Sequence, residues 1–207
     1  MDVSPRFWDK IAVKYSKQKI ADEESYRKKL EKSQSYFRPD MELLEFGCGT
    51  GGTAILHAPH VKHIRAIDIS PKMIEIAEGR AAAASVDNID FEVQTIENLD
   101  APDQAFDAIL GLSIMHLVQD KEAVLDKVLR LLKPNGVFIS STVCMSDMAR
   151  VFRYVIPLMQ FFGRAPFVAY FSREELLQSI RTAGFEIDYD WQPGKSAAVF
   201  VVAKKPA

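Results

Sequence analysis

The sequence predicts an α/β fold built around a parallel β-sheet that helices cover on both faces. Short apolar runs alternate with longer segments whose apolar residues recur at helical spacing, as in a series of β-α-β units. The short runs are apolar at nearly every position, which is typical of strands buried on both faces. A glycine-rich turn follows the first of these runs, at residues 47–52, and the rest of the chain is arranged around it.

Length and composition indicate one domain. The chain has 207 residues, of which 48% are hydrophobic and 26% charged, enough for a sizeable core. Its net charge of -2 creates no field that would attract nucleic acid, so we expect no nucleic-acid partner. No export signal is visible at Met1–Pro5, and the most apolar stretch, 151–171, is interrupted by arginines and prolines and would make a poor membrane span. We therefore expect a cytoplasmic protein without a transmembrane segment.

Residues 4–37 are expected to be helical and separate from the sheet. Apolar and aromatic residues at helical spacing predict a first helix after Ser4-Pro5; they are Phe7, Trp8, Ile11, Ala12 and Tyr15. A second, Lys- and Glu-rich helix is predicted from about Asp22 to Phe37, because Pro39 cannot continue it.

Predicted strands and helices alternate along most of the remaining chain. Strands are predicted at 42–46, 64–69, 89–93, 106–110, 137–142, 185–191 and 197–203. Helices are predicted from Ser70-Pro71, from about Asp120 to the 133–136 stop, and from the capping box at Ser172 to Gly184. The last two strands are joined by the short turn 192–195, which only an antiparallel pair can use.

The glycine-rich turn is compatible with two ligand classes. Gly47-x-Gly49-x-x-Gly52 satisfies a dinucleotide fingerprint, Gly47-x-Gly49-x-Gly51 satisfies a turn that binds S-adenosylmethionine, and Asp68 lies where an acid would meet ribose hydroxyls in either case. Glu45, just before the turn, disfavours a pyrophosphate and favours a ligand with an ammonium group. The terminal strand pair also argues against a simple dinucleotide domain.

Four motifs in order resemble those of class I S-adenosylmethionine-dependent methyltransferases. They are Glu45–Gly51, Ala66–Met73, Phe106–Leu110 and Leu131–Gly136. The subgroup that the chain most resembles is the small-molecule enzymes that include ubiquinone and menaquinone methyltransferases. The resemblance implies a Rossmann-like three-layer sandwich whose seven-stranded, mostly parallel sheet has an antiparallel last strand. It also implies one methyltransferase domain over 1–207, with a helical cap (1–38), a cofactor-binding core (41–144), a lid insertion (145–171) and a final helix and strand pair (172–207).

The resemblance implies a binding site for S-adenosylmethionine, with S-adenosylhomocysteine as product. Its expected cofactor-binding residues are Glu45, Gly47, Cys48, Gly49, Gly51, Asp68, Ile69, Met73, Thr95, Ile96 and Gly111. Asp68 would accept the ribose hydroxyls, and Glu45 would face the ammonium group. The family often carries Asp at the position of Thr95, so adenine recognition is expected to depend more on backbone and packing.

The acceptor is expected to be a small, apolar or amphipathic molecule. His116 could act as a general base near the mouth of the site, or be a histidine without chemistry; Tyr15 could close over the cofactor, or anchor the cap. No metal site is expected, because Pro59 interrupts the spacing of His57, His60 and His63. A nicotinamide-dependent oxidoreductase and a non-catalytic S-adenosylmethionine-binding protein are the alternatives.

The insertion at 145–171 is unusually aromatic. Three interpretations are open: a helix packed on the core, a roof over an apolar acceptor together with the 7–15 helix, or a peripheral contact with a membrane surface. The first requires Phe161 and Phe162 to be buried.

Overall fold

A seven-stranded sheet forms the centre of the computed structural model, which describes residues 4–148, 152–162, 164–194 and 196–207. Its strand order is β3-β2-β1-β4-β5-β7-β6. The strands are β1 (Glu42–Phe46), β2 (His63–Asp68), β3 (Ile89–Val93), β4 (Phe106–Leu112), β5 (Leu132–Thr142), β6 (Glu186–Trp191) and β7 (Val199–Lys204). β7 is antiparallel to both of its neighbours, and the other pairs are parallel, as predicted.

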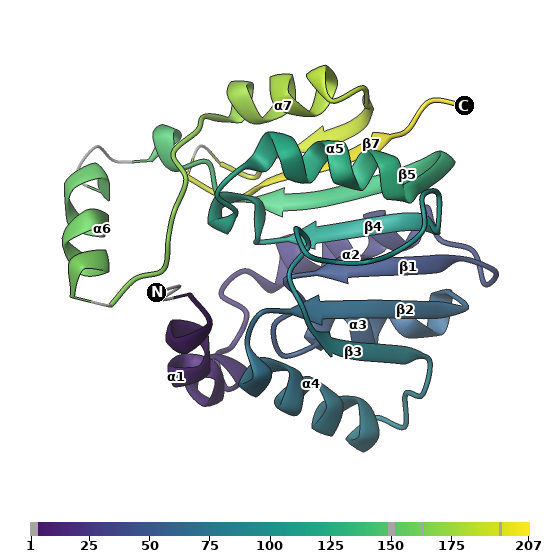
Figure 1. The fold of residues 1–207 in the computed structure, drawn as a ribbon, viewed down its shortest axis with the longest axis horizontal. Coiled ribbons are helices and arrows are strands. Elements are labelled where there is room, and N and C mark those ends of the chain that lie inside the picture. Colours follow the sequence, from purple (N-terminus) through teal and green to yellow (C-terminus); the bar gives the residue numbers. More distant parts are fainter. Residues whose placement is uncertain (1–3, 149–151, 163, 195) are drawn as a thin grey trace.

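Helices lie on both faces of this sheet (Figure 1). The α-helices are α1 (Ser4–Ser16), α2 (Glu23–Gln34), α3 (Gly52–His57), α4 (Pro71–Ala83), α5 (Lys121–Leu131), α6 (Phe152–Phe161) and α7 (Arg173–Thr182). Short 3₁₀ turns cover Ala58–His60, Met115–Leu117 and Met145–Asp147. One face of the sheet packs against α5 and α7, and the other against α3 and α4 with the end of α2, so the core has two parts.

The helix starts follow from local chemistry. The hydroxyl of Ser70 caps α4 by accepting from Met73 N, and Pro71 occupies the first turn, where a missing N–H costs nothing. Ser172 and Glu175 form the predicted capping box at α7.

Several predicted boundaries were wrong at element ends. β4 continues through Gly111 and Leu112 because these residues pair with Ser140 and Ser141 of β5. β5 begins at Leu132 rather than at 137. Residues 133–136, where the preceding helix was predicted to stop, belong to this strand, because Asn135 N donates to Lys205 O and Lys205 N donates to Gly136 O.

The other boundaries shift by one to three residues. α2 ends at Gln34, and the backbone N–H groups of Tyr36 and Phe37 close tighter turns. β2 begins and ends one residue earlier, and β6 and β7 begin later, than predicted. Lys195, in the predicted turn between β6 and β7, lies outside the described residues.

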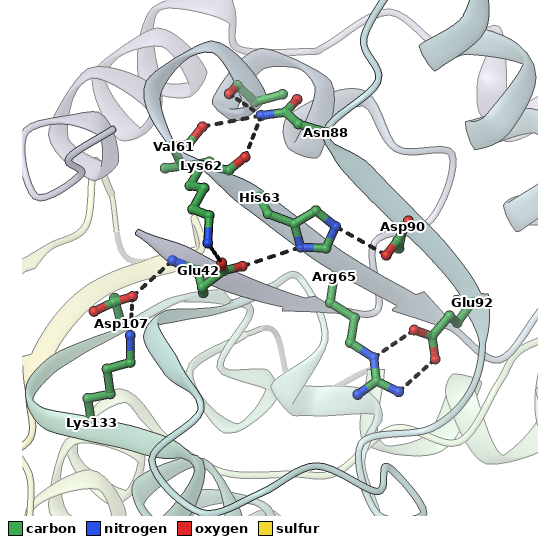
Figure 2. A network of polar contacts seen from close by, with 11 residues as sticks. Glu42, Val61, Lys62, His63, Arg65, Asn88, Asp90, Glu92, Asp107 and Lys133 are labelled. Atoms are coloured by element: carbon green, nitrogen blue, oxygen red, sulfur yellow. Dashed lines mark hydrogen bonds and ion pairs between the residues drawn. The ribbon is translucent and has the colours of Figure 1, made fainter. Parts of the chain in front are cut away.

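Polar side chains join the strands at the amino edge of the sheet (Figure 2). Asp107 accepts from Glu42 N and from Lys133 Nζ, at 2.9 and 2.7 Å, which connects β1, β4 and β5. His63 lies between Glu42 and Asp90, so its ring nitrogens have carboxylate partners. These groups lie at the end of the sheet opposite the cavity described next.

Candidate active site

A cavity of about 450 Å³ opens at the carboxyl ends of β1, β2, β3 and β4. Its lining includes Trp8, Tyr15, Phe46, Gly47, Gly49, Asp68, Ile69, Met73, Gln94, Thr95, Ile96, Glu97, Asn98, Leu112, Ser113, Ile114, Leu117, Val118, Gln119, Asp120, Pro166 and Phe167. Ligands of open α/β sheets bind at this edge, because the loops there diverge between neighbouring strands.

The turn after β1 forms one wall. Gly49 has φ +56°, a left-handed conformation that residues with a β-carbon rarely adopt. A β-carbon built on it would lie 3.8 Å from Cε1 of Tyr15, so the tyrosine ring stands over the turn. The structure thus brings Tyr15 of α1 to the glycines that the sequence singled out.

Asp68 ends β2 at the cavity. Its Oδ2 accepts from Gly49 N and its Oδ1 accepts from Ser70 N, both at 2.9 Å. Burial raises the pKa of this carboxyl, although the two backbone hydrogen bonds oppose the increase. Asp68 therefore has two functions available: it holds the glycine turn, and it presents a carboxylate to the cavity.

Glu45 is a buried carboxyl that forms no ion pair with the described residues. Its side chain is 3% exposed, and Oε2 has no hydrogen-bond partner in the described part of the chain. Desolvation raises the pKa of Glu45 to about 8. A buried polar atom in this state is unfavourable unless a ligand or a proton satisfies it.

This raised pKa predicts a pH dependence of stability. Between about pH 4.5, the ordinary pKa of glutamate, and about pH 8, the folded protein retains a proton that the unfolded chain releases. The free energy of unfolding should therefore fall as the pH rises through this window, by up to ~1.4 kcal/mol per pH unit from this group. Glu45→Gln should remove this contribution, as urea unfolding of the ligand-free proteins across the window would show. Parallel pH profiles for the two proteins would contradict the assignment.

Two side chains hold α1 beside the cavity. Oδ1 of Asp9 accepts from Ser70 Oγ at 2.6 Å and from Lys72 N at 3.1 Å, at the start of α4. Arg80 donates to Thr50 Oγ1 at 2.7 Å and to the carbonyl of Ser16. The cap, the glycine turn and α4 are thereby connected.

α2 contributes polar groups at the same edge. Tyr26 Oη lies 3.2 Å from Thr53 Oγ1, and Lys29 Nζ donates to Ser141 Oγ at 3.0 Å. Burial lowers the pKa of Lys29. These contacts connect α2 with α3 and with the end of β5.

His116 does not line the cavity. Its Nδ1 lies 3.1 Å from Thr142 Oγ1, which also accepts from His116 N at 3.3 Å, and its carbonyl accepts from Ala169 N at 2.8 Å. Burial lowers the pKa of His116 to about 4, which makes the ring neutral and only weakly basic at neutral pH. In this arrangement His116 joins the end of β5 to the segment that carries Phe167.

The structure gathers most of the predicted ligand-binding residues around the cavity. Gly47, Gly49, Asp68, Ile69, Met73, Thr95 and Ile96 line it, together with Tyr15. Glu45, Cys48, Gly51 and Gly111 are not in its lining. Cys48 donates its N–H to Ile67 O, while β-carbons on Gly51 and Gly111 would meet Ala77 and the Phe46 ring.

Sequence reasoning missed lining residues in two loops. Gln94, Glu97 and Asn98 follow β3, and Ser113, Ile114 and Leu117 follow β4. Their position directly after predicted strands was the available signal, since the carboxyl ends of parallel strands share one edge. The left-handed φ of Ser113, +60°, was not visible in the sequence.

Some aromatic residues of the insertion at 145–171 lie on the surface, and others lie at the cavity or in the core. Phe161 and Phe162 are 82% and 64% exposed, so the interpretation of a helix packed on the core was wrong for them. Pro166 and Phe167 line the cavity, and Phe171 is buried beneath it in the core. The side chain of Phe152, another of the aromatic residues noted, lies outside the described residues.

Comparison with known proteins places this geometry in a family. Residues 37–180 match the family model described as "Methyltransferase domain". A curated relative, the uncharacterized methyltransferase YcgJ of Bacillus subtilis, is 32% identical over 102 residues, which cover 49% of this chain. The chain spans only 40% of that relative's length.

Two further similarities extend over more of the chain. The demethylmenaquinone methyltransferase of Symbiobacterium thermophilum is 29% identical over 84% of this chain and 80% of its own length. A crystal structure of a putative S-adenosylmethionine-dependent methyltransferase from Listeria monocytogenes superimposes with a TM-score of 0.74 at 20% identity, covering 87% of this chain and 96% of that one. The second similarity concerns the fold alone.

Proposed function

The chain belongs to the class I S-adenosylmethionine-dependent methyltransferases, and we propose that it methylates a small, apolar or amphipathic acceptor bound beside the glycine turn. The observation that carries the proposal is the buried carboxyl of Glu45 in β1, the strand that leads into the glycine turn, together with a cavity lined by this turn, Asp68 and apolar side chains. The demethylmenaquinone methyltransferase among its relatives supports an apolar acceptor.

The chemistry of the lining fits the cofactor. Asp68 offers a carboxylate to ribose hydroxyls, and Ile69, Met73 and Ile96 offer apolar walls to an adenine ring. Glu45, whose Oε2 has no partner among the residues that the structure describes, would accept from the ammonium group of the methionine part, directly or through water. When bound, the cofactor supplies an electrophilic methyl group on a sulfonium centre.

In this proposal the residues of the chain mainly position and enclose the cofactor and the acceptor. Tyr15 lies over the glycine turn from α1 with Trp8 edge-on to its ring, and Ile114, Leu117 and Phe167 add an apolar surface to the lining. Such a surface would exclude water and hold an acceptor in line with the reacting methyl group, which is the greater part of catalysis for a simple displacement. His116 would act as a positioning residue rather than as a base, given its contacts with Thr142 and Ala169.

Phe167→Ala is expected to weaken acceptor use selectively. Truncation removes apolar surface that would contact the acceptor, so KM for the acceptor should rise roughly tenfold while the Kd for cofactor changes less than about twofold. Steady-state kinetics and titration calorimetry measure the two effects. The matched control, Leu56→Ala, removes an exposed apolar side chain on α3 and should alter neither. Equal losses of cofactor and acceptor binding would refute this role of Phe167.

The proposed activity is tested by methyl transfer. The purified chain, incubated with S-adenosylmethionine labelled in its methyl group and with a metabolite extract, should transfer label to extractable small molecules. Asp68→Ala, assayed at a cofactor concentration near the wild-type Kd, serves as the control with reduced transfer. Tight cofactor binding without transfer to any acceptor would instead favour a non-catalytic binding protein.

A further inference from the structure

The helix α6 carries an apolar face that no other described part of the chain covers. Five of its side chains, and that of the following Phe162, are exposed; they are Tyr154, Val155, Leu158, Met159, Phe161 and Phe162. We refer to these six residues as the α6 face. Tyr154, Leu158 and Phe161 recur at helical spacing, and Phe161 and Phe162 pack edge-to-face with ring centroids 5.3 Å apart. Contiguous apolar surface of this kind marks an interaction site.

The α6 face lies at the functional end of the molecule. Figure 1 shows α6 beyond the carboxyl ends of the parallel strands, on the same side as α1. The chain leaves α6 at Phe161 and reaches the cavity at Pro166 and Phe167. Whatever binds the α6 face therefore lies near the loop that lines the cavity.

The described residues near this face are basic rather than acidic. Arg164 is exposed just after α6, and the sequence from 152 to 171 contains no Asp or Glu. α1 and the residues after it add five exposed cations, Arg6, Lys10, Lys14, Lys17 and Lys19. The one acid of α1, Asp9, is engaged with Ser70 and Lys72.

The exposed apolar face and the nearby cations together favour an anionic lipid surface as the occupant. A second copy of this chain would bring two sets of cations together without matching acids, which opposes association. An anionic bilayer surface offers both an apolar interior for aromatic side chains and phosphate groups for arginine and lysine. α6 has 10 residues, so at 1.5 Å per residue it is about 15 Å long and would lie in the interface rather than cross it. Among the described residues, no helix is long and apolar enough to span a membrane.

We propose that the α6 face, flanked by the basic α1, docks the protein on an anionic lipid surface with the Phe167 side of its cavity toward the bilayer. This extends the proposed function, because an apolar acceptor could then pass from the lipid to the cavity without crossing water. Docking itself depends only on the α6 face and α1, and does not require methyl transfer.

Flotation of the full chain with two kinds of vesicle tests the proposal. One kind is phosphatidylcholine alone, and the other contains phosphatidylglycerol as well. The protein should bind the anionic vesicles much more strongly, and added salt should weaken binding because it screens the cations. Phe161→Ser with Phe162→Ser should lower the bound fraction roughly tenfold on anionic vesicles. Lys10→Glu with Lys14→Glu should abolish the preference for the anionic lipid.

Leu56→Ser is the control, because Leu56 is exposed on α3, away from the α6 face. Leu56→Ser should bind vesicles like the wild type. Calorimetric titration with S-adenosylmethionine separates the two proposals: the phenylalanine and lysine variants should lose vesicle binding or its lipid preference, while all variants keep the wild-type cofactor affinity. Equal binding of wild type and the phenylalanine variant to anionic vesicles would overturn the docking proposal. So would a dimer, found by sedimentation, that dissociates in this variant while neither protein binds vesicles.

Discussion

Replacing Asp68 with alanine is expected to weaken S-adenosylmethionine binding by roughly 1.5–3 kcal/mol, about 10- to 150-fold. The carboxylate would be lost from the cavity, leaving the ribose hydroxyls without their acceptor. The N–H groups of Gly49 and Ser70 would lose their partner as well, so the turn should also loosen. Titration calorimetry at a temperature where the variant is folded measures the affinity.

Ser70→Ala is a control for disturbance at the start of α4. It removes the cap of α4 and the contact with Asp9 but leaves the carboxylate of Asp68 in place. We expect it to lower the free energy of unfolding by about 1 kcal/mol and to leave cofactor affinity nearly unchanged. An Asp68→Ala protein that is folded and binds cofactor like the wild type would show that Asp68 serves the turn alone.

Gly49→Val is expected to have a larger effect, with cofactor affinity falling more than about 100-fold. Gly49 has φ +56°, and a β-branched residue in that region costs on the order of 1–3 kcal/mol. The nearest atom to a β-carbon there is 3.8 Å away, so the chain should still fold, with the added methyl groups between the turn and Tyr15. Calorimetry and circular dichroism together separate lost binding from lost structure.

Gly79→Ala is the matched control for this substitution. Gly79 is exposed within α4, and a β-carbon there meets nothing within 4 Å. It should raise the free energy of unfolding by roughly 0.5–1 kcal/mol and leave cofactor affinity unchanged. Near-native affinity in a folded Gly49→Val protein would mean that the turn is not the cofactor cradle.

The parts of the fold that depend on local chemistry could be predicted. The run Glu42–Phe46 with its glycine turn, the Ser70-Pro71 start of α4 and the Ser172 capping box each carry their signal within a few residues. The antiparallel pair at the C-terminus followed from the length of its connection. Because these local signals place the strand ends, most of the predicted binding residues lie in the lining of the cavity.

Features that depend on pairing or burial could not be predicted. β4 continues to Leu112 only because Ser141 lies beside it, and that neighbour comes from almost thirty residues later. Histidine is a common general base, but the residues around His116 bury its ring, and its Nδ1 forms a hydrogen bond with Thr142 Oγ1. The aromatic composition of the insertion was evident, but the exposure of Phe161 on the surface and the position of Phe167 in the cavity lining became visible only in the structure.

Titration of the wild-type chain with S-adenosylmethionine, and separately with NAD, tests the central claim most directly. The claim is that Glu45, Asp68 and the glycine turn form a cofactor site for the sulfonium ligand. Calorimetry at neutral pH should give one binding site for S-adenosylmethionine, with a Kd in the micromolar range or below, and no heat of binding for NAD. Because the ammonium group would lower the raised pKa of Glu45, binding should also release a proton, seen as a dependence of the heat on the buffer. Binding of NAD, with no binding of S-adenosylmethionine, would contradict the claim.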